Sequence, residues 1–171
     1  PPLAYVSRVE GSYFDPATAY VSFDAHRQND HKPYVFVTRD YGRTWSSISS
    51  TLPAFGNVNV VKQDPRNKDV LYAGTEYGFY ISLNEGREWK RLMTNLPVGR
   101  IDDVVVHPRD GDLVLGTHHR SVWIMDDITS LQQLTPQVQG SDAHLFDVRP
   151  AVAWLSDRSP QRSVTGDKTT V

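Results

Sequence analysis

Three carboxylates, those of Glu76, Asp102 and Asp103, could take part in acid–base catalysis. A glycosidase needs two carboxyl groups about 5 to 10 Å apart, one as acid and one as base or nucleophile. Asp102 and Asp103 point to opposite faces if they sit on a strand, so at most one of them enters a shared site. Glu76 would then supply the second group. A catalytic pair is therefore an alternative interpretation and not the leading one.

A second chemical possibility is a metal site at His118 and His119. Neighbouring residues on a strand point to opposite sides, so both could bind one ion only from a turn, and no third ligand is evident. We predict no metal site. The sequence also contains no phosphate-binding loop, dinucleotide fingerprint, nucleophile elbow or zinc-ligand spacing, and it therefore indicates no cofactor.

Recognition of a polar ligand is the third possibility, and it rests on loops that should share one end of the fold. These loops also carry His26, Arg27, Asp30, His31 and Asn57. The ligand contacts that we predict are Glu76, Tyr77, Arg100, Asp103, His118 and Arg120. Acidic, basic and aromatic groups together suit a polar ligand or a protein segment. The alternative is that these are ordinary solvated loops, which are polar by default.

The elements that must position these loops are indicated by an eight-residue pattern that occurs twice. Residues 38–45 read Thr-Arg-Asp-Tyr-Gly-Arg-Thr-Trp, and residues 82–89 read Ser-Leu-Asn-Glu-Gly-Arg-Glu-Trp. The shared positions are Thr38, Asp40, Gly42 and Trp45 in one copy, and Ser82, Asn84, Gly86 and Trp89 in the other. Each copy follows an aromatic and β-branched run, which is typical of a hairpin that recurs once per repeat.

We interpret both segments as structural turns. The side chain of Asp40 or Asn84 can accept hydrogen bonds from nearby backbone N–H groups, and the Gly two positions later can take a positive φ. The Trp begins the returning strand and offers a large apolar surface to the neighbouring repeat. Because Asn84 can accept these bonds but cannot be a general acid, a structural role is favoured over a catalytic one.

Other signals repeat with these turns and predict three repeats of four short strands. An X-Pro step at residues 14–16, 63–65 and 106–108 separates the first strand of each repeat from the second. The expected strands are 4–9, 19–23, 34–37 and 45–48; then 58–61, 70–74, 79–82 and 89–92; then 101–106, 113–116, 121–125 and, less distinctly, 131–134. Four short strands per repeat of about 43 to 53 residues match the blade of a propeller.

The turn pattern resembles the Asp box, S/T-x-D-x-G-x-T/S-W, of the BNR-repeat β-propellers, which include sialidases, xyloglucan-active glycosidases and sortilin-type receptors. In that group the box is a turn on the outer hairpin of a blade, remote from the ligand-binding channel. Residues 71–78, 106–110 and 115–127 resemble the last blades of large bacterial proteins with sortilin-like, glycosyl-hydrolase-like propellers. This chain departs from that pattern at Asn84, Glu88 and His119. The resemblance implies export in bacteria, to the periplasm or beyond.

The predicted fold class is all-β, a partial β-propeller of about three four-stranded antiparallel blades with a C-terminal extension. The predicted divisions are residues 1–53, a blade with the box at 38–45; 54–97, a blade with a degenerate box at 82–89; 98–135, a blade without a box; and 136–171, a strap or linker with a flexible end. A propeller closes with about four to eight blades. We therefore expect this chain to be a fragment, or its open ends to be covered by partner chains.

Composition narrows the function classes. The formal charge of −2 and the 22% of charged residues give no basic excess of the kind that nucleic-acid binding needs, so nucleic acid is not an expected partner. No apolar run approaches the length of a transmembrane helix. The sequence contains no Cys, which excludes disulfides and thiolate chemistry within this stretch.

The sequence therefore favours a non-catalytic module that binds a protein or ligand, such as a peptide or glycan, within a larger propeller protein. One alternative is a piece of a glycoside hydrolase of the xyloglucanase or sialidase kind. Another is an accessory subunit whose open blade edges dock on partners in a large assembly. The partners expected in every case are further blades of the same protein or partner subunits.

Overall fold

The computed structural model describes residues 4–92, 94–119, 121–150, 152–155 and 167–170 of the chain. Antiparallel sheets dominate these residues, as the sequence predicts. The first sheet contains β1 (Tyr5–Gly11), β2 (Ala19–Asp24), β3 (Tyr34–Thr38) and β4 (Ser46–Ser47). The second contains β5 (Val58–Gln63), β6 (Leu71–Thr75), β7 (Phe79–Ser82) and β8 (Lys90–Arg91). The third contains β9 (Ile101–Val106), β10 (Leu113–Thr117) and β11 (Val122–Met125).

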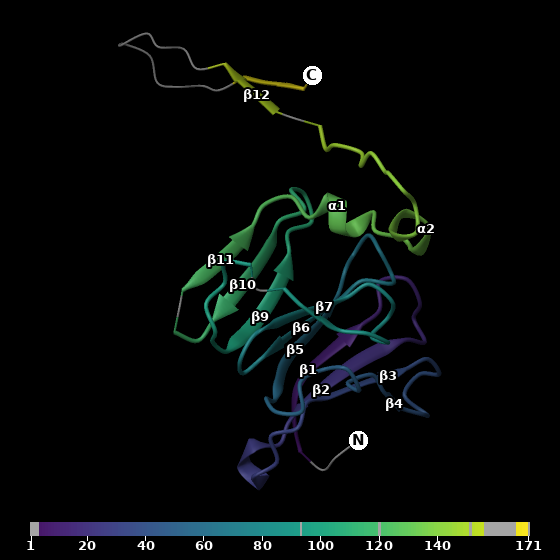
Figure 1. Cartoon of the computed structure of the whole chain (residues 1–171), viewed down its shortest axis with the longest axis vertical. Coiled ribbons are helices and arrows are strands. Elements are labelled where there is room, and N and C mark those ends of the chain that lie inside the picture. The colour runs from purple at the N-terminus through teal and green to yellow at the C-terminus, as the bar shows by residue number, and fades with distance from the viewer. Residues whose placement is uncertain (1–3, 93, 120, 151, 156–166, 171) are drawn as a thin grey trace.

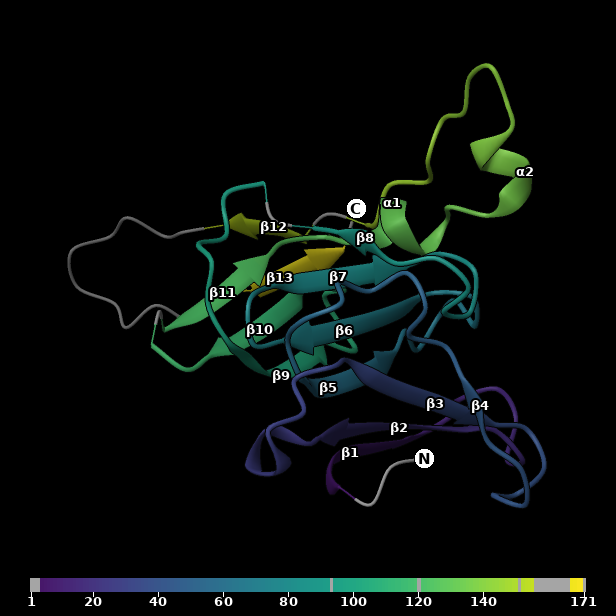
Figure 2. The same ribbon diagram turned by 60° about the horizontal axis from the view of Figure 1, so that its bottom comes forward.

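Each sheet is a meander in which consecutive strands are neighbours, and the three sheets stack face to face in chain order (Figures 1 and 2). Contacts between sheets involve mainly their first strands, with β1 and β2 against β5, and β5 and β6 against β9. The sheets therefore converge at their first strands. This arrangement confirms the predicted all-β class of repeated antiparallel units.

The third sheet differs from the prediction at its fourth strand. Residues 131–134 were expected to be extended, but the helix α1 (Thr129–Gln132) occupies this segment. Asp127 Oδ1 accepts hydrogen bonds from the backbone N and Oγ1 of Thr129, which starts the turn. Gln132 then donates from Nε2 to both carboxylate oxygens of buried Asp64, at 3.2 and 3.0 Å. The helix is thus held by the second sheet, and no fourth strand forms there.

The C-terminal segment contains more regular structure than the sequence predicts. A second short helix, α2 (Pro136–Gln139), has Thr135 as its N-cap, whose side chain accepts from the Val138 backbone N. Further on, β12 (Val152–Leu155) pairs with β13 (Asp167–Thr170) in an antiparallel hairpin apart from the three sheets (Figure 1). The expected flexible end spans residues 156–171. Of these, 156–166 and 171 lie outside the described residues, and 167–170 form a strand.

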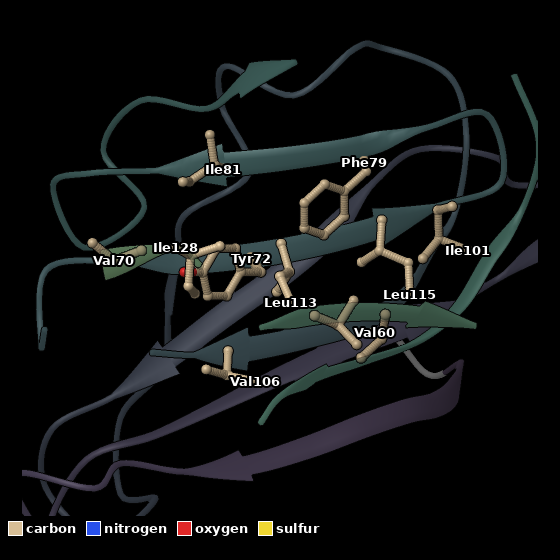
Figure 3. Packing of buried hydrophobic residues seen from close by; sticks show 11 residues of the cluster. Val60, Val70, Tyr72, Phe79, Ile81, Ile101, Val106, Leu113, Leu115 and Ile128 are labelled. Atoms are coloured by element: carbon tan, nitrogen blue, oxygen red, sulfur yellow. The ribbon is translucent and has the colours of Figure 1, made fainter. Parts of the chain in front are cut away.

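Two apolar clusters hold the three sheets together. One lies between the first and second sheets and includes Tyr20, Val35, Val58, Leu71 and Trp89. The other lies between the second and third sheets and includes Val60, Tyr72, Phe79, Ile101, Val104, Leu113 and Leu115 (Figure 3). Because side chains alternate along a strand, the second sheet contributes buried residues from both of its faces. It is the only one of the three sheets with a described neighbour on each side.

Gly74 is where the second and third sheets approach most closely. A Cβ added to it would lie 2.6 Å from Val60 Cγ1 and 2.8 Å from Ile101 Cγ2, too close for any side chain. Gly116 holds the same register position in the third sheet, since each of these glycines precedes a Thr at the end of the second strand. The nearest atom to a Cβ there is 3.6 Å away, which is an ordinary contact. No sheet covers that face of the third sheet among the described residues.

The two predicted turns join β3 to β4 and β7 to β8. Asp40 Oδ1 accepts from the Thr44 backbone N at 2.8 Å, and Asp40 Oδ2 accepts from Thr44 Oγ1 at 2.6 Å. Asn84 Oδ1 accepts from the Glu88 backbone N at 2.9 Å, which reproduces the first of these bonds. Gly42 and Gly86 have φ of 84° and 85°. The predicted left-handed glycines are confirmed, although the backbone donor lies four residues along the chain instead of two.

The two tryptophans differ in burial because only Trp89 follows a sheet against which it can pack. Trp89 is 5% exposed in the cluster between the first two sheets, and its Nε1 donates to the Ile48 carbonyl at 2.7 Å. Trp45 is half-buried, and its Nε1 donates to the Gly42 carbonyl within its own turn. The prediction that the Trp packs against a neighbouring repeat is therefore confirmed for Trp89. Trp45 has no described sheet before it to pack against.

We expect Gly74→Ala to lower the free energy of unfolding by about 1 to 3 kcal/mol, because the added methyl group overpacks the contact with Val60 and Ile101. Gly116→Ala is the matched control and should be neutral or slightly stabilising in the 171-residue chain. Urea unfolding measures both. Equal losses for the two variants would contradict the packing described for Gly74.

The charge of Asp40 should make part of the stability depend on pH. Hydrogen bonds from the side chain and backbone of Thr44 hold the pKa of Asp40 below its ordinary value. A depressed carboxyl pKa stabilises the fold fully above the unfolded pKa of about 4, and this contribution is lost as the pH falls through the lower folded pKa. Asp40→Asn should therefore be less stable than the wild type at neutral pH, and the difference should shrink in acid.

Urea unfolding at a series of pH values measures this difference. Asp142→Asn, which makes the same change at an exposed residue of the C-terminal segment, serves as the control for the substitution itself. A constant difference for Asp40→Asn would show that its charge does not stabilise the turn.

Candidate functional site

The predicted binding loops do share one end of the stacked sheets. They join β2 to β3, β6 to β7 and β10 to β11, and they connect each sheet to the next, whereas the turns at 38–45 and 82–89 lie at the opposite end (Figure 2). We call the first end the loop face. The β2–β3 loop contains one turn of 3-10 helix at His26–Gln28.

Each first strand carries an irregularity near the loop face. The register of pairing shifts at Ser7 in β1, at Asn59 in β5 and at Asp102 in β9. Each of these residues is an extra residue without an opposite partner, which is the definition of a β-bulge. Bulges re-aim side chains, so the strict alternation that we assumed for Asp102 and Asp103 does not hold there. The sequence does not reveal these bulges except through a polar residue within an apolar strand.

The bulge residues link consecutive sheets by hydrogen bonds. Ser7 Oγ donates to the Val58 carbonyl at 2.7 Å, and Asn59 Nδ2 donates to the Ile101 carbonyl at 3.2 Å. Val58 and Ile101 are equivalent, since each precedes the bulge of its own strand. The third residue of the series is Asp102, which accepts and does not donate hydrogen bonds when ionised.

Asp102 is instead the centre of a charged group at the loop face. Arg100 Nε donates to Asp102 Oδ1 at 2.6 Å, and His118 Nδ1 lies 3.2 Å from Asp102 Oδ2. The neighbouring Asp103 forms an ion pair with Arg8, which links the first strand of the first sheet to that of the third. Three of the six predicted contacts, Arg100, Asp103 and His118, are therefore already engaged in ion pairs or charged hydrogen bonds.

Two adjoining clefts open at the loop face. One has a volume of about 360 Å³ and is lined by the 3-10 helix, Tyr5 and Arg100. The other has a volume of about 190 Å³ and is lined entirely by polar side chains, among them His31, Asn57 and Glu76. Asp24, His26 and Arg100 line both clefts, and we call the two adjoining clefts together the groove. We refer to the smaller one as the polar cleft.

Asp24 supplies a fixed negative charge to the groove. Its Oδ1 accepts from the backbone N of His26 at 2.9 Å and lies 2.6 Å from His26 Nδ1. Burial acts to raise the pKa of Asp24, but these hydrogen bonds and the positive charges of His26 and Arg100 outweigh it, so the pKa lies below its ordinary value. Sequence reasoning missed Asp24 because it ends a strand that reads as core.

The polar cleft contains buried polar atoms that the described residues leave without a hydrogen-bond partner. They are His31 Nδ1, Asn57 Oδ1 and Glu76 Oε2. Asn57 is only 2% exposed. Most buried polar groups in proteins are paired, so three unpaired atoms around one cleft make it a candidate binding site.

The predicted contacts do not all lie together. Glu76 and Arg100 line the polar cleft, whereas Asp103 and His118 belong to the charged group beside it. Tyr77 lies in a row of stacked rings with Phe55. Arg120 lies outside the described residues.

Two absences hold for the part of the chain that the structure describes. No group of three or more acidic or histidine side chains is arranged to hold a metal ion there. Nor does any helix in those residues have the length and apolar character needed to cross a membrane.

The fold is similar to that of solved glycoside hydrolases. The GH74 enzyme of Niastella koreensis matches with a TM-score of 0.56 and 20% identity, covering 71% of this chain and 21% of the enzyme. The GH74 xyloglucanase of Xanthomonas campestris matches with a TM-score of 0.58 and 15% identity, covering 99% of this chain and 27% of the enzyme. The chain has a partial β-propeller fold. Its three sheets are blades of that propeller, and they span less than a third of the length of these enzymes.

Identities this low establish the fold alone. YCF48 bound to a D1 peptide also matches, at 17% identity over 73% of this chain and 41% of that one, but with a TM-score of 0.46 it carries no weight here. No protein-family model and no curated protein sequence matches the chain. The finer assignment to BNR or sortilin-like propellers therefore stays a prediction.

We expect Asn59→Leu to lower the free energy of unfolding by about 1 to 3 kcal/mol, because the buried Ile101 carbonyl loses its side-chain donor at the junction of the second and third blades. Ser46→Ala alters an exposed residue at the outer edge of the first blade and should change stability little. Urea unfolding compares the two. An unchanged free energy of unfolding for Asn59→Leu would show that this hydrogen bond does not stabilise the junction of the two blades.

Proposed function

We propose that the chain forms consecutive blades of a larger propeller protein and acts as a non-catalytic recognition module, with its ligand in the groove at the loop face. The observation that carries this proposal is the polar cleft, in which three buried polar atoms have no hydrogen-bond partner among the described residues. A preformed concave site with a few convergent polar groups is the usual form of a binding site.

The outer faces of the first and third blades support the view that further blades adjoin them. Val6 and Val9 of β1 are 44% and 65% exposed, and Val122 and Ile124 of β11 are 62% and 59% exposed. Their equivalents on the second blade are buried between neighbours. Exposed apolar faces of this kind are typical of surfaces that pack against another structural element. The occupant that fits them is another blade of the same fold, which continues the stack in each direction.

The recognition role is assigned to the groove and its rim. Glu76 lies within the polar cleft with one unpaired oxygen, and Tyr77 offers an aromatic ring beside it. Arg100 bridges the two clefts, and the charged group formed with Asp102 continues the polar surface toward His118. Asp103 and Arg120 complete the set of contacts that the sequence predicts. No step of this role requires a cofactor.

A glycoside hydrolase is the second candidate function. The observations that favour it are the similarity in fold to GH74 enzymes, one of them a xyloglucanase, and the presence of two carboxylates, Asp24 and Glu76, around one cleft. It ranks second because Asp24 is already bound to the backbone and ring of His26, and its pKa is lowered, which suits a fixed charge better than a general acid.

The test screens the purified protein against peptide and glycan arrays and compares two double variants. The double variant with Glu76→Gln and Arg100→Gln removes one negative and one positive charge from the groove. We expect it to weaken the binding of a ligand identified on the arrays at least tenfold. Arg87→Gln with Glu88→Gln makes the same change at the exposed turn on the opposite end and should leave binding unchanged.

The outcome that would contradict the site is equal binding by both double variants. Release of reducing sugar from xyloglucan or a sialoside, abolished by Glu76→Gln, would instead establish the enzyme function.

A further inference from the structure

Two hydrogen-bond acceptors in the polar cleft are left without a donor. Asn57 Oδ1 and Glu76 Oε2 are acceptors, both buried and both without a partner in the described part of the chain. A buried acceptor that stays unpaired destabilises the protein, and more so when it is charged. Whatever fills this cleft should therefore present N–H or O–H groups toward Asn57 and Glu76.

The charges around the cleft favour a cation over a neutral donor. Among the charged side chains that line the cleft, Asp24 is held by His26, and Arg100 is held at 2.6 Å by the Asp102 carboxylate. The described residues supply no oppositely charged partner for Glu76, so its carboxylate gives the cleft an uncompensated negative charge. A positively charged donor gains from this field, whereas a sugar hydroxyl does not.

A row of three rings borders the same cleft. His31 lines the cleft and stacks on Phe55 with ring centres 5.0 Å apart, and Phe55 stacks on Tyr77 at 5.8 Å. Phe55 and Tyr77 are 58% and 42% exposed, so this row presents aromatic surface to a ligand. A planar guanidinium stacks on aromatic faces and presents five N–H donors in a rigid fork, whereas an ammonium is a compact, strongly hydrated charge.

The backbone fixes these groups in place. The Gly56 backbone N donates to the His31 carbonyl at 2.7 Å, and the Glu76 backbone N donates to the Asn57 carbonyl at 3.1 Å. These two bonds tie the loop after the first blade to the β2–β3 and β6–β7 loops. The acceptors and the rings are therefore positioned before any ligand arrives, which lowers the entropic cost of binding.

We propose that the polar cleft binds the guanidinium group of an arginine side chain from a partner polypeptide. The guanidinium donates to Glu76 Oε2 and Asn57 Oδ1, and its plane or its stem lies against the exposed ring of Phe55 or Tyr77. This inference rests on the proposed recognition function and names the group that the groove recognises. Lysine lacks the planar fork and should bind more weakly.

The test uses N-acetyl-L-arginine amide and its neutral isostere, N-acetyl-L-citrulline amide, titrated into the isotopically labelled protein and followed by NMR. We expect the arginine compound to bind at least tenfold more tightly than the citrulline compound and to shift the side-chain amide signals of Asn57. Glu76→Gln should reduce the affinity for the arginine compound at least tenfold. Glu88→Gln, the same change on the exposed turn at the opposite end, should not.

Equal affinity for the two compounds would overturn the inference, and so would a failure of the arginine compound to shift the Asn57 signals. Those results leave the recognition function intact if a peptide or glycan from the arrays binds the wild type and the double variant with Glu76→Gln and Arg100→Gln weakens that binding. The recognition function itself fails only if no array ligand responds to that double variant. Phe55→Ala supplies an independent check, since it alters an exposed ring and should weaken arginine binding without unfolding the protein.

Discussion

The packing of one blade against the next is the constraint on which the rest of the structure depends. A four-stranded sheet of such short strands buries little by itself, and its stability comes from the apolar layer that it shares with a neighbour. At the junction of the second and third blades, Gly74 allows Val60 and Ile101 to meet without a gap. The hydrogen bond from Asn59 to the Ile101 carbonyl lies at the same junction, close to the loop face. Stacking and the shape of the binding groove are therefore set by the same residues.

Equivalent residues in successive blades differ in burial according to whether a described blade lies beside them. Trp89 is buried against the first blade, whereas its equivalent Trp45 is half-buried, and Gly74 is closely covered, whereas its equivalent Gly116 is open. The same residue type at the same register position has two environments because only the second blade has described neighbours on both sides. This contrast explains why the outer faces are apolar and supports the proposal that further blades continue the stack. The bulge residues differ as well. Ser7 and Asn59 donate hydrogen bonds to the next blade, whereas Asp102 has a carboxylate at the equivalent position, which accepts them.

The fold could be predicted from the sequence because its signals are local. Alternating apolar runs, X-Pro steps and the repeated turn at Asp40 each specify a strand or a turn within a few residues. The helix α1 was missed because it depends on Gln132 reaching Asp64, a long-range contact. The polar cleft was predicted only in part. Glu76 and Arg100 fall in polar loops, but Asn59 and Asp24 are placed by a bulge and a strand end that no local pattern indicates.

The central claim is that the apolar outer faces of the first and third blades are covered in the native protein. Hydroxyl-radical footprinting compares the oxidation rates of two outer-face residues in the protein isolated in its native form and in the 171-residue chain alone. Ile124 lies on the outer face of the third blade, and Phe36 lies on that of the first blade, since it pairs with Val21, the partner of Val9. Tyr41, which is 73% exposed on a turn, is the internal reference. We expect strong protection of Ile124 and Phe36 in the native protein and none of Tyr41. Equal oxidation of Ile124 and Phe36 in both samples would show that these faces are uncovered.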